Sequence, residues 1–136
     1  MNDEGFPAPD TSITHILVVS DIARSRAWYT DVLGATLYRE YAGSSVVLSF
    51  AGAWLLLVTE GGPTVDKPAV VLAPPDDPDR LDHLFTIRVT SCTETYALLR
   101  SRGATFLTPP VVHGAETRCF FRDPDGHLFE ISEYRG

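Results

Sequence analysis

Two histidines and one glutamate are the residues of this sequence that could together hold a reactive metal ion. His15 and His83 each stand near the start of a β-rich run, and Glu130 stands inside the last apolar run. Because side chains alternate along a strand, both histidines share a face with apolar neighbours. An ionised glutamate buried among apolar residues costs several kcal/mol unless it is paired or binds a metal. The sequence therefore predicts one divalent ion held by His15, His83 and Glu130.

A site with two histidines and one carboxylate leaves coordination positions open for a substrate and, with iron(II), for dioxygen. This set of ligand types fits Fe(II) or Mn(II) best, and it is also compatible with Zn(II) or Ni(II). The alternative for each histidine taken alone is a hydrogen-bonded core residue without a metal. Glu60, at the end of a predicted strand beside Gly61, is a weaker further candidate for a ligand.

A repeat in the sequence gives the two histidines similar surroundings. Each is followed by a β-rich run, a polar turn, a helical stretch and the triplet Gly-Ala-Thr. Gly34 follows His15 by 19 positions (34 − 15), and Gly103 follows His83 by 20 (103 − 83). Duplication of one unit explains these matches. A pseudo-twofold axis between the two copies would bring His15 and His83 together.

The second halves of the two units correspond as β-hairpins whose tight turns end at Gly52 and Gly126. Leu56 and Glu130 each stand four positions after these glycines (56 − 52 and 130 − 126). The position in the first unit that should supply a fourth ligand is therefore a leucine. On that side the predicted metal site is incomplete.

The elements that must position these residues form two tandem βαβββ modules. The fold class is α+β, with the two modules forming an incomplete β-barrel around a metal or ligand cleft. Helices are predicted at about residues 22–33, with Asp21 as N-cap, and at 93–102, and each ends at a glycine. Strands are predicted at residues 13–19, 37–41, 46–50, 54–59, 83–89, 105–107, 118–122 and 127–133.

The chain divides into an N-terminal tail (residues 1–12), a first module (13–60), a proline-rich linker (61–81) and a second module (82–134). Five prolines in the linker argue against a regular element there and favour an extended surface segment. Two such modules can pair within one chain or exchange between two chains. A homodimer is expected.

The composition limits the class of partner. The formal net charge is -7 and there is no cluster of Lys or Arg, so nucleic acid is not an expected partner. The longest apolar run, residues 53–58, is far shorter than the ~20 residues that span a bilayer, and the start of the chain lacks a signal-peptide pattern. We expect a cytoplasmic protein with a small-molecule substrate. Cys92 and Cys119 are expected to be small buried thiols.

Two motifs carry a resemblance to a known superfamily. They are WYTDVLG at residues 28–34 and FRDPDGHLFE at residues 121–130. Together they resemble the vicinal oxygen chelate superfamily, which includes glyoxalase I, methylmalonyl-CoA epimerase, fosfomycin-resistance thiol transferases, extradiol dioxygenases and bleomycin-resistance proteins. The resemblance covers nearly the whole chain. It implies that His15, His83 and Glu130 correspond to the metal ligands of the family.

The resemblance also bears on the reaction. The further Glu or Gln ligand of glyoxalase I and the epimerase corresponds to Leu56, which weakens the reading as a lyase or epimerase. Extradiol dioxygenases use two His and one Glu, and their acid/base histidine lies near the position of His113. Their substrate-contacting tyrosine corresponds to Phe120. We therefore predict a metal-dependent, dioxygenase-like enzyme acting on a small oxygenated substrate, with His113 as its acid/base.

Two further alternatives remain open. A fosfomycin-type thiol transferase would need a cationic cluster, for which only Arg88 and Arg118 are candidates. A bleomycin-type protein would bind a drug without metal chemistry, in a groove lined by aromatic residues. The residues predicted to line the substrate pocket are Trp54, Leu56, Phe85 and Phe120.

Overall fold

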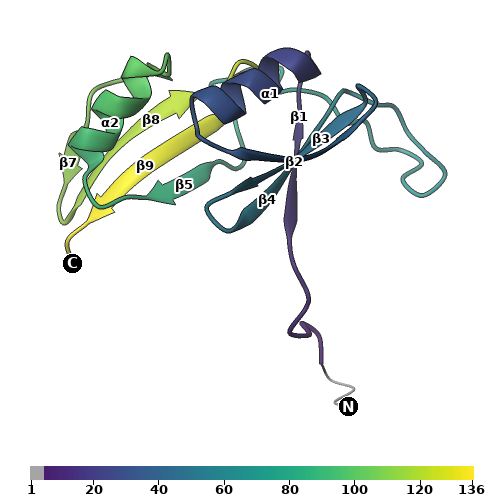
Figure 1. Ribbon diagram of the computed structural model, residues 1–136, viewed down its shortest axis with the longest axis horizontal. Coiled ribbons are helices and arrows are strands. Elements are labelled where there is room, and N and C mark those ends of the chain that lie inside the picture. The colour runs from purple at the N-terminus through teal and green to yellow at the C-terminus, as the bar shows by residue number, and fades with distance from the viewer. Residues whose placement is uncertain (1–4) are drawn as a thin grey trace.

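Each predicted module folds into one β-sheet with one helix (Figure 1). The computed structural model describes residues 5–136, so residues 1–4 of the predicted N-terminal tail lie outside the described residues. The α+β class is confirmed, and the two sheets remain separate, as expected for an incomplete barrel. Within residues 5–136, no helix has the length and apolar character needed to cross a membrane.

The first sheet has the strand order β1-β4-β3-β2. Its module consists of β1 (Thr14–Val18), α1 (Ile22–Asp31), β2 (Thr36–Tyr41), β3 (Ser45–Phe50) and β4 (Ala53–Val58). The hairpin between β3 and β4 turns at Ala51 (φ 50°) and Gly52 (φ 81°), as a two-residue turn with two positive φ angles requires. β1 pairs with β4 in parallel. The chain that connects these two strands runs through α1, β2 and β3.

The second sheet has the strand order β5-β9-β8-β6, and β7 also pairs with β8. Its module consists of β5 (Phe85–Arg88), α2 (Cys92–Ser101), β6 (Thr105–Phe106), β7 (Val111–His113), β8 (Glu116–Arg122) and β9 (Leu128–Tyr134). The sequence did not predict β7, because its three residues are all exposed and show no burial pattern. The predicted strand at 83–89 begins only at Phe85, so His83 precedes β5.

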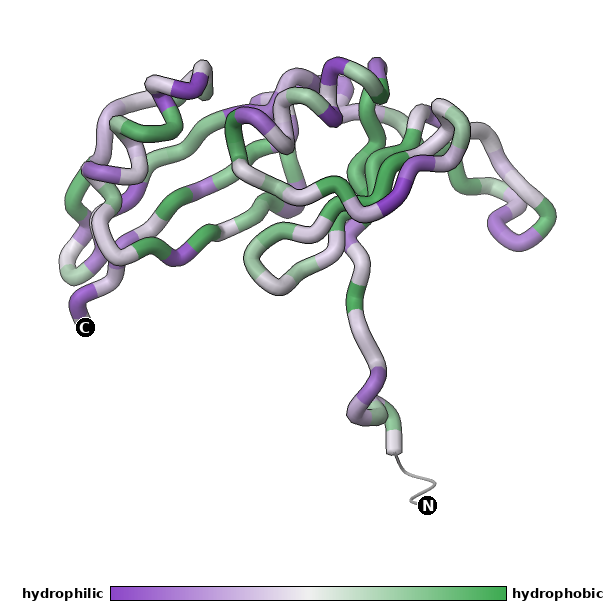
Figure 2. Tube along the Cα trace, viewed as in Figure 1, coloured by the Kyte–Doolittle hydropathy of each residue, from purple (hydrophilic) through white to green (hydrophobic). Residues whose placement is uncertain are grey.

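One apolar core extends through both modules on the helix-covered faces of the sheets. Leu17 and Leu57 of the first sheet and Phe129 of the second belong to it. Trp28 of α1 lies against Phe129, with ring centroids 6.2 Å apart, so this helix contacts the sheet of the other module. Figure 2 shows apolar residues along the strands of both sheets. The two modules therefore share one interior.

The opposite side of each sheet is here called its open face. On the first sheet it carries apolar side chains: Ile16 is 51% exposed and Tyr38 is 61% exposed. Tyr38 packs against Trp54 on this face, with ring centroids 5.0 Å apart. On the second sheet the open face is polar and includes Glu130 and Arg118. The two open faces thus differ in chemical character.

Helix α2 is fixed to the second sheet at its N-terminus. Ser91 caps the helix by accepting a hydrogen bond from the N–H of Glu94. The N–H of Cys92 donates to Glu133 Oε1 on β9 at 2.9 Å, which places a carboxylate at the positive end of the helix dipole. This hydrogen bond and the nearby Arg135 hold the pKa of Glu133 below its usual value of 4.5.

The lowered pKa of Glu133 predicts a pH dependence of stability. A carboxyl whose pKa is lower in the folded state stabilises the fold above its unfolded value, and the contribution is lost as the pH falls below that value. Urea unfolding of Glu133→Gln between about pH 6 and pH 3 should therefore show a smaller loss of stability than the wild type. The exposed Glu60→Gln serves as the control and should behave like wild type. Equal acid sensitivity of Glu133→Gln and wild type would contradict the assignment.

Candidate functional site

The two candidate histidines meet at the boundary between the two sheets. His15 Nε2 and His83 Nε2 lie 3.1 Å apart, which confirms the predicted approach of these side chains. The ring of Phe85 is close to both, with its centroid 4.4 Å from that of His15 and 6.0 Å from that of His83. Residues far apart in the sequence therefore form one aromatic cluster.

The surroundings of the two histidines differ. His15 lies on β1 beside Leu55 and shares the helix-covered face with Leu17. Burial, together with the nearby His83 and His127, lowers the pKa of His15 below its usual value. The side chain of His83 is instead 59% exposed, and its Nδ1 lies 3.3 Å from Asp82 Oδ1. The prediction that both histidines face the interior is correct for His15 and wrong for His83, because His83 precedes its strand.

The repeat relates His15 to a different residue from the one predicted. Val19 N–H donates to Val58 O, and Val89 N–H donates to Ser132 O in the second module. These two bonds occupy equivalent places in the two modules. Four residues before Val19, His15 pairs with Leu55, and four residues before Val89, Phe85 pairs with Phe129. The counterpart of His15 is therefore Phe85, two positions after His83 (85 − 83). The two histidines approach each other without being related by the pseudo-symmetry.

Glu130 is buried, as predicted, but on the open face of the second sheet. Only 7% of the residue is exposed. It lies opposite Phe120 and beside Thr86 in the strand register. Its Oε1 accepts a hydrogen bond from the Thr86 hydroxyl at 2.7 Å, and its Oε2 lies 3.8 Å from Arg118 Nε. These two partners compensate the buried carboxylate without a metal ion.

The predicted metal set is therefore not assembled in this structure. Strand neighbours point to opposite faces, so Glu130 and the core residue Phe129 point to opposite sides of β9, whereas His15 faces the core side of β1. Within the described residues, no group of three or more His, Cys, Asp or Glu side chains could hold a metal ion. The residues do not fit a single divalent ion in this arrangement. Metal binding by His15, His83 and Glu130 stays a prediction.

The other candidate ligand and acid/base residues lie elsewhere. His113 is exposed on β7, opposite Glu116 of β8. β7, β8, β9 and β5 follow one another across the sheet, which places His113 three strand spacings, roughly 14 Å, from β5. Glu60 is exposed just beyond the end of β4. Their catalytic and ligand roles stay predictions.

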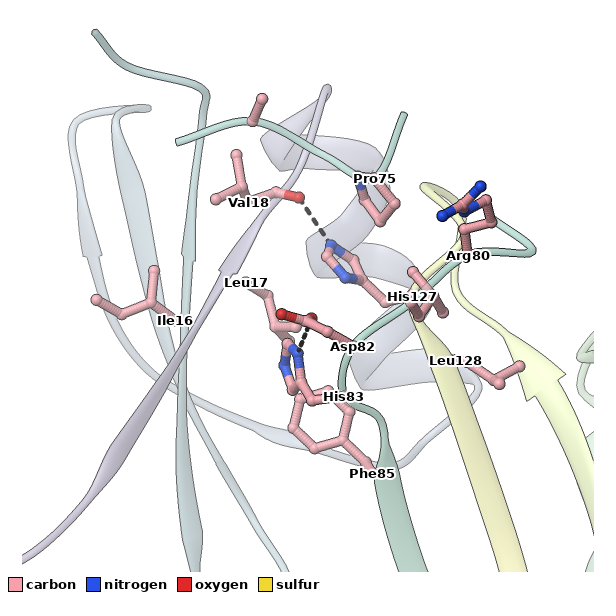
Figure 3. Close-up of a pocket in the computed structure, with 12 residues that line it drawn as sticks. Ile16, Leu17, Val18, Pro75, Arg80, Asp82, His83, Phe85, His127 and Leu128 are labelled. Atoms are coloured by element: carbon pink, nitrogen blue, oxygen red, sulfur yellow. Dashed lines mark hydrogen bonds and ion pairs between the residues drawn. The ribbon is translucent and has the colours of Figure 1, made fainter. Parts of the chain in front are cut away.

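Two clefts flank the histidine pair. The first, of about 340 Å³, is here called the His127 cleft and is lined by residues that include Val18, Arg80, Asp82, His83 and His127. Figure 3 shows its side chains, with His127 directed at Val18 and Asp82 beside His83. The second, of about 510 Å³, is here called the Trp54 cleft. Its lining includes Ile13, His15, Phe50, Trp54, Phe85 and Arg88.

The predicted pocket residues divide between these clefts and the open faces. Trp54 and Phe85 line the Trp54 cleft. Leu56 lies beside Ile16 on the open face of the first sheet, just as Glu130 lies beside Thr86 on the second. The predicted equivalence of Leu56 and Glu130 is therefore confirmed by the register. Phe120 lies on the open face of the second sheet, with its ring 5.7 Å from the guanidinium carbon of Arg118.

Sequence reasoning missed the contact between the two motifs. Tyr29, from the first motif, donates its hydroxyl to Asp123 Oδ2 at 2.6 Å, and Asp123 belongs to the second motif. Asp125, two residues later, accepts from the N–H of Ser20 at 3.1 Å. His127 Nε2 donates to Val18 O at 2.8 Å. The occurrence of both motifs in one chain was the signal that could have indicated this contact.

The family model described as Glyoxalase/Bleomycin resistance protein/Dioxygenase superfamily matches residues 12–131. This chain belongs to that superfamily. The resemblance carried by the two motifs is thereby confirmed. No match was found among curated proteins.

Several solved structures share the fold. One from Nocardioides is 24% identical, with a TM-score of 0.73 over 93% of this chain and 85% of that chain. TioX from Micromonospora sp. ML1 is 20% identical, with a TM-score of 0.71 over 92% and 99%. The fosfomycin resistance protein FosX from Listeria monocytogenes is 19% identical, with a TM-score of 0.67 over 92% of each chain. At these identities the likeness shows the fold alone.

The contact between the two motifs predicts a loss of stability in Tyr29→Phe. Asp123 is 5% exposed, and burial raises the pKa of this carboxyl. Removing the Tyr29 hydroxyl leaves Asp123 Oδ2 without this donor, which should lower the free energy of unfolding by about 1–3 kcal/mol. Urea unfolding monitored by circular dichroism measures the difference. Tyr38→Phe, on the exposed open face, is the matched control; equal stability of the two variants would refute the role of this bond.

Proposed function

We propose that this chain binds a small organic molecule in the Trp54 cleft and does so without a metal ion held by His15, His83 and Glu130. The observation that carries the proposal is the placement of Glu130 on the open face of β9, where Thr86 and Arg118 already satisfy it. Of the functions that the superfamily leaves open, the non-catalytic, bleomycin-type binding protein agrees best with this geometry.

The lining of the Trp54 cleft supports the binding of an aromatic or apolar molecule. Phe50 and Phe85 supply aromatic surface, and aliphatic residues supply most of the remainder. Trp54 borders the cleft, and its ring packs against Tyr38 on the open face. Phe85 stacks on the buried Phe129, with centroids 4.7 Å apart and planes 15° apart, which fixes the position of its ring. Concave sites with mostly apolar linings and few polar groups are typical of small-molecule pockets.

The catalytic alternatives receive less support from the same geometry. A dioxygenase-like reaction would require His113 to act near the metal, but His113 lies on the far side of the second sheet. A glyoxalase-like reaction would require a carboxylate or amide at Leu56. A fosfomycin-type transferase would require a cluster of free cations, but of its two candidates Arg118 is already near Glu116 and Glu130, which leaves Arg88 alone. These reactions therefore lack a supporting arrangement of side chains.

The binding function predicts saturable binding of a neutral aromatic probe. Calorimetric titration with 2-naphthol should give the same affinity with and without EDTA. Phe50→Ala removes one aromatic side of the cleft and should weaken binding roughly tenfold. Tyr41→Ala, which is exposed on β2 and outside the lining given for the cleft, is the control.

Two outcomes would overturn the proposed function. One is the absence of saturable binding to the wild-type chain. The other is binding that appears only after anaerobic addition of Fe(II), Mn(II) or Zn(II) and disappears in His83→Ala. The second result would support the metal site predicted from the sequence.

We also propose that the chain forms a homodimer that covers the open face of the first sheet. Ile16 and Tyr38 leave large apolar surfaces exposed there, next to Trp54 and Leu56. Contiguous apolar surface of this kind favours association. Light scattering after size-exclusion chromatography should give twice the 14.9 kDa chain mass.

Ile16→Glu tests the location of the dimer contact. A charge on β1, beside Leu56 on this face, should shift the population toward the monomer. Val65→Glu, at a fully exposed linker residue, is the control and should leave the mass unchanged. A monomeric wild-type chain, or a dimer that tolerates Ile16→Glu, would refute the contact.

A further inference from the structure

We infer that the Trp54 cleft selects a neutral aromatic ligand with a phenolic hydroxyl group, which donates a hydrogen bond to Nδ1 of His15. This inference rests on the proposed binding function and names the class of ligand. A single acceptor in an apolar cleft favours a ligand with one matching donor, because a polar group that loses water needs a new partner.

The aromatic and aliphatic side chains of the cleft lie on one side of the sheets. Phe50, Leu55, Phe85 and Ile87 belong to the shared core or pack against it, so they line the cleft from the helix-covered side. His15 lies on this side as well, with its ring centroid 4.4 Å from that of Phe85. A ligand that contacts the apolar lining is therefore next to His15.

The polar side chains of β5 point to the other face. The Thr86 hydroxyl donates to Glu130, and Arg88 Nη1 donates to Ser132 Oγ, so both side chains are engaged on the open face. Because side chains alternate along a strand, neither points toward a ligand on the core side. Of the lining residues that the structure describes, His15 is the one polar side chain on the core side. A charged ligand would find no opposite charge there.

The hydrogen bonds of the histidine pair decide which nitrogen of His15 is an acceptor. The carboxylate of Asp82 only accepts, so Nδ1 of His83, at 3.3 Å from Asp82 Oδ1, carries the proton. In a neutral imidazole the other nitrogen is then an acceptor, so His83 Nε2 accepts from His15 Nε2 at 3.1 Å. The opposite assignment would direct a lone pair of His83 at the carboxylate. Nδ1 of His15 therefore keeps its lone pair for a ligand.

Nδ1 of His15 is accessible from the Trp54 cleft. Among residues 5–136 it has no hydrogen-bond partner, and no buried side-chain nitrogen or oxygen in these residues lacks a partner, so this atom is not enclosed. His15 lines the Trp54 cleft, whereas His83 lines the His127 cleft. The open space beside Nδ1 is therefore that of the Trp54 cleft.

A hydroxyl group at the edge of a planar ring system matches this arrangement. The rings would bury their apolar surface against Phe50 and Leu55, and Leu55 is the strand neighbour of His15. An ether oxygen at the same place has no hydrogen to donate. A carboxylate would bring an unpaired charge among apolar side chains, which is costly. The cleft therefore suits an aromatic alcohol better than the matching ether or acid.

Two probes that differ in one hydrogen-bond donor test this inference. 2-Naphthol and 2-methoxynaphthalene share the ring system, and only the first can donate. Calorimetry on the full chain is carried out at about pH 8, where a phenolic hydroxyl keeps its proton. 2-Naphthol should bind roughly three- to tenfold more tightly, as expected for one neutral hydrogen bond.

His15→Phe keeps a flat ring and removes the acceptor. The affinity for 2-naphthol should fall to that for 2-methoxynaphthalene, whose own affinity should stay as in the wild type and so report an intact cleft. His15→Asn places an amide oxygen near the position of Nδ1 and should restore part of the preference. A preference for 2-naphthol that survives in His15→Phe would overturn the inference. His15→Leu supplies a second variant without an acceptor if urea unfolding shows that His15→Phe is not folded.

Arg80→Gln is the matched control, because Arg80 lines the His127 cleft. This variant should bind both probes like wild type. Loss of the preference in Arg80→Gln, with His15→Phe unaffected, would place the ligand in the other cleft and overturn the inference.

The remaining outcomes separate the inference from the function on which it rests. If both probes bind the wild type with equal affinity, the binding function stands and selection by His15 is refuted. If neither probe binds, the proposed function fails and the inference fails with it.

Discussion

Consecutive residues of a β-strand point to opposite faces of the sheet, and this constraint governs the arrangement of functional groups throughout the molecule. Val19 and Val89 fix the register of β1 and β5 through their hydrogen bonds to β4 and β9. Once these bonds are made, His15 must face the core side and Glu130 must face the open side. Each sheet is therefore apolar beneath its helix and has a separate surface on the other face.

Side chains of the turn at residues 123–127 and of helix α1 join the two sheets. Asp123 accepts the Tyr29 hydroxyl and the backbone N–H groups of Asp125 and His127, so one buried carboxylate organises the turn and fastens it to the helix. Trp28 extends the same contact into the core of the second sheet. The motifs that are most recognisable in the sequence serve the joint between the modules. Their presence accordingly says much about the fold and little about a reaction.

The duplicated architecture could be predicted from the sequence because hairpin turns and helix ends leave local signals. Gly52 and Gly126 aligned the hairpins correctly, and the equivalence of Leu56 and Glu130 follows from them. The equivalence of the two histidines does not hold. α1 ends three residues before Gly34 and α2 ends two residues before Gly103, so an alignment on these glycines misplaces the preceding strands.

A shift of one residue along a strand changes the face on which a side chain lies, and this explains why the site was harder to predict than the fold. Two imidazoles and a carboxylate are typical metal ligands, yet the register places Glu130 on the opposite face from His15. The bond from Thr86 to Glu130 depends on pairing between strands 44 residues apart (130 − 86), for which the sequence holds no local signal.

The Trp54 cleft is lined by residues of both modules, with His15 and Trp54 from one and Phe85 and Arg88 from the other. Neither module alone contains it. The cavity therefore exists only where the two modules meet. Because each side of the cavity belongs to a different module, a substitution in either module changes one wall of the cavity and leaves the other wall in place.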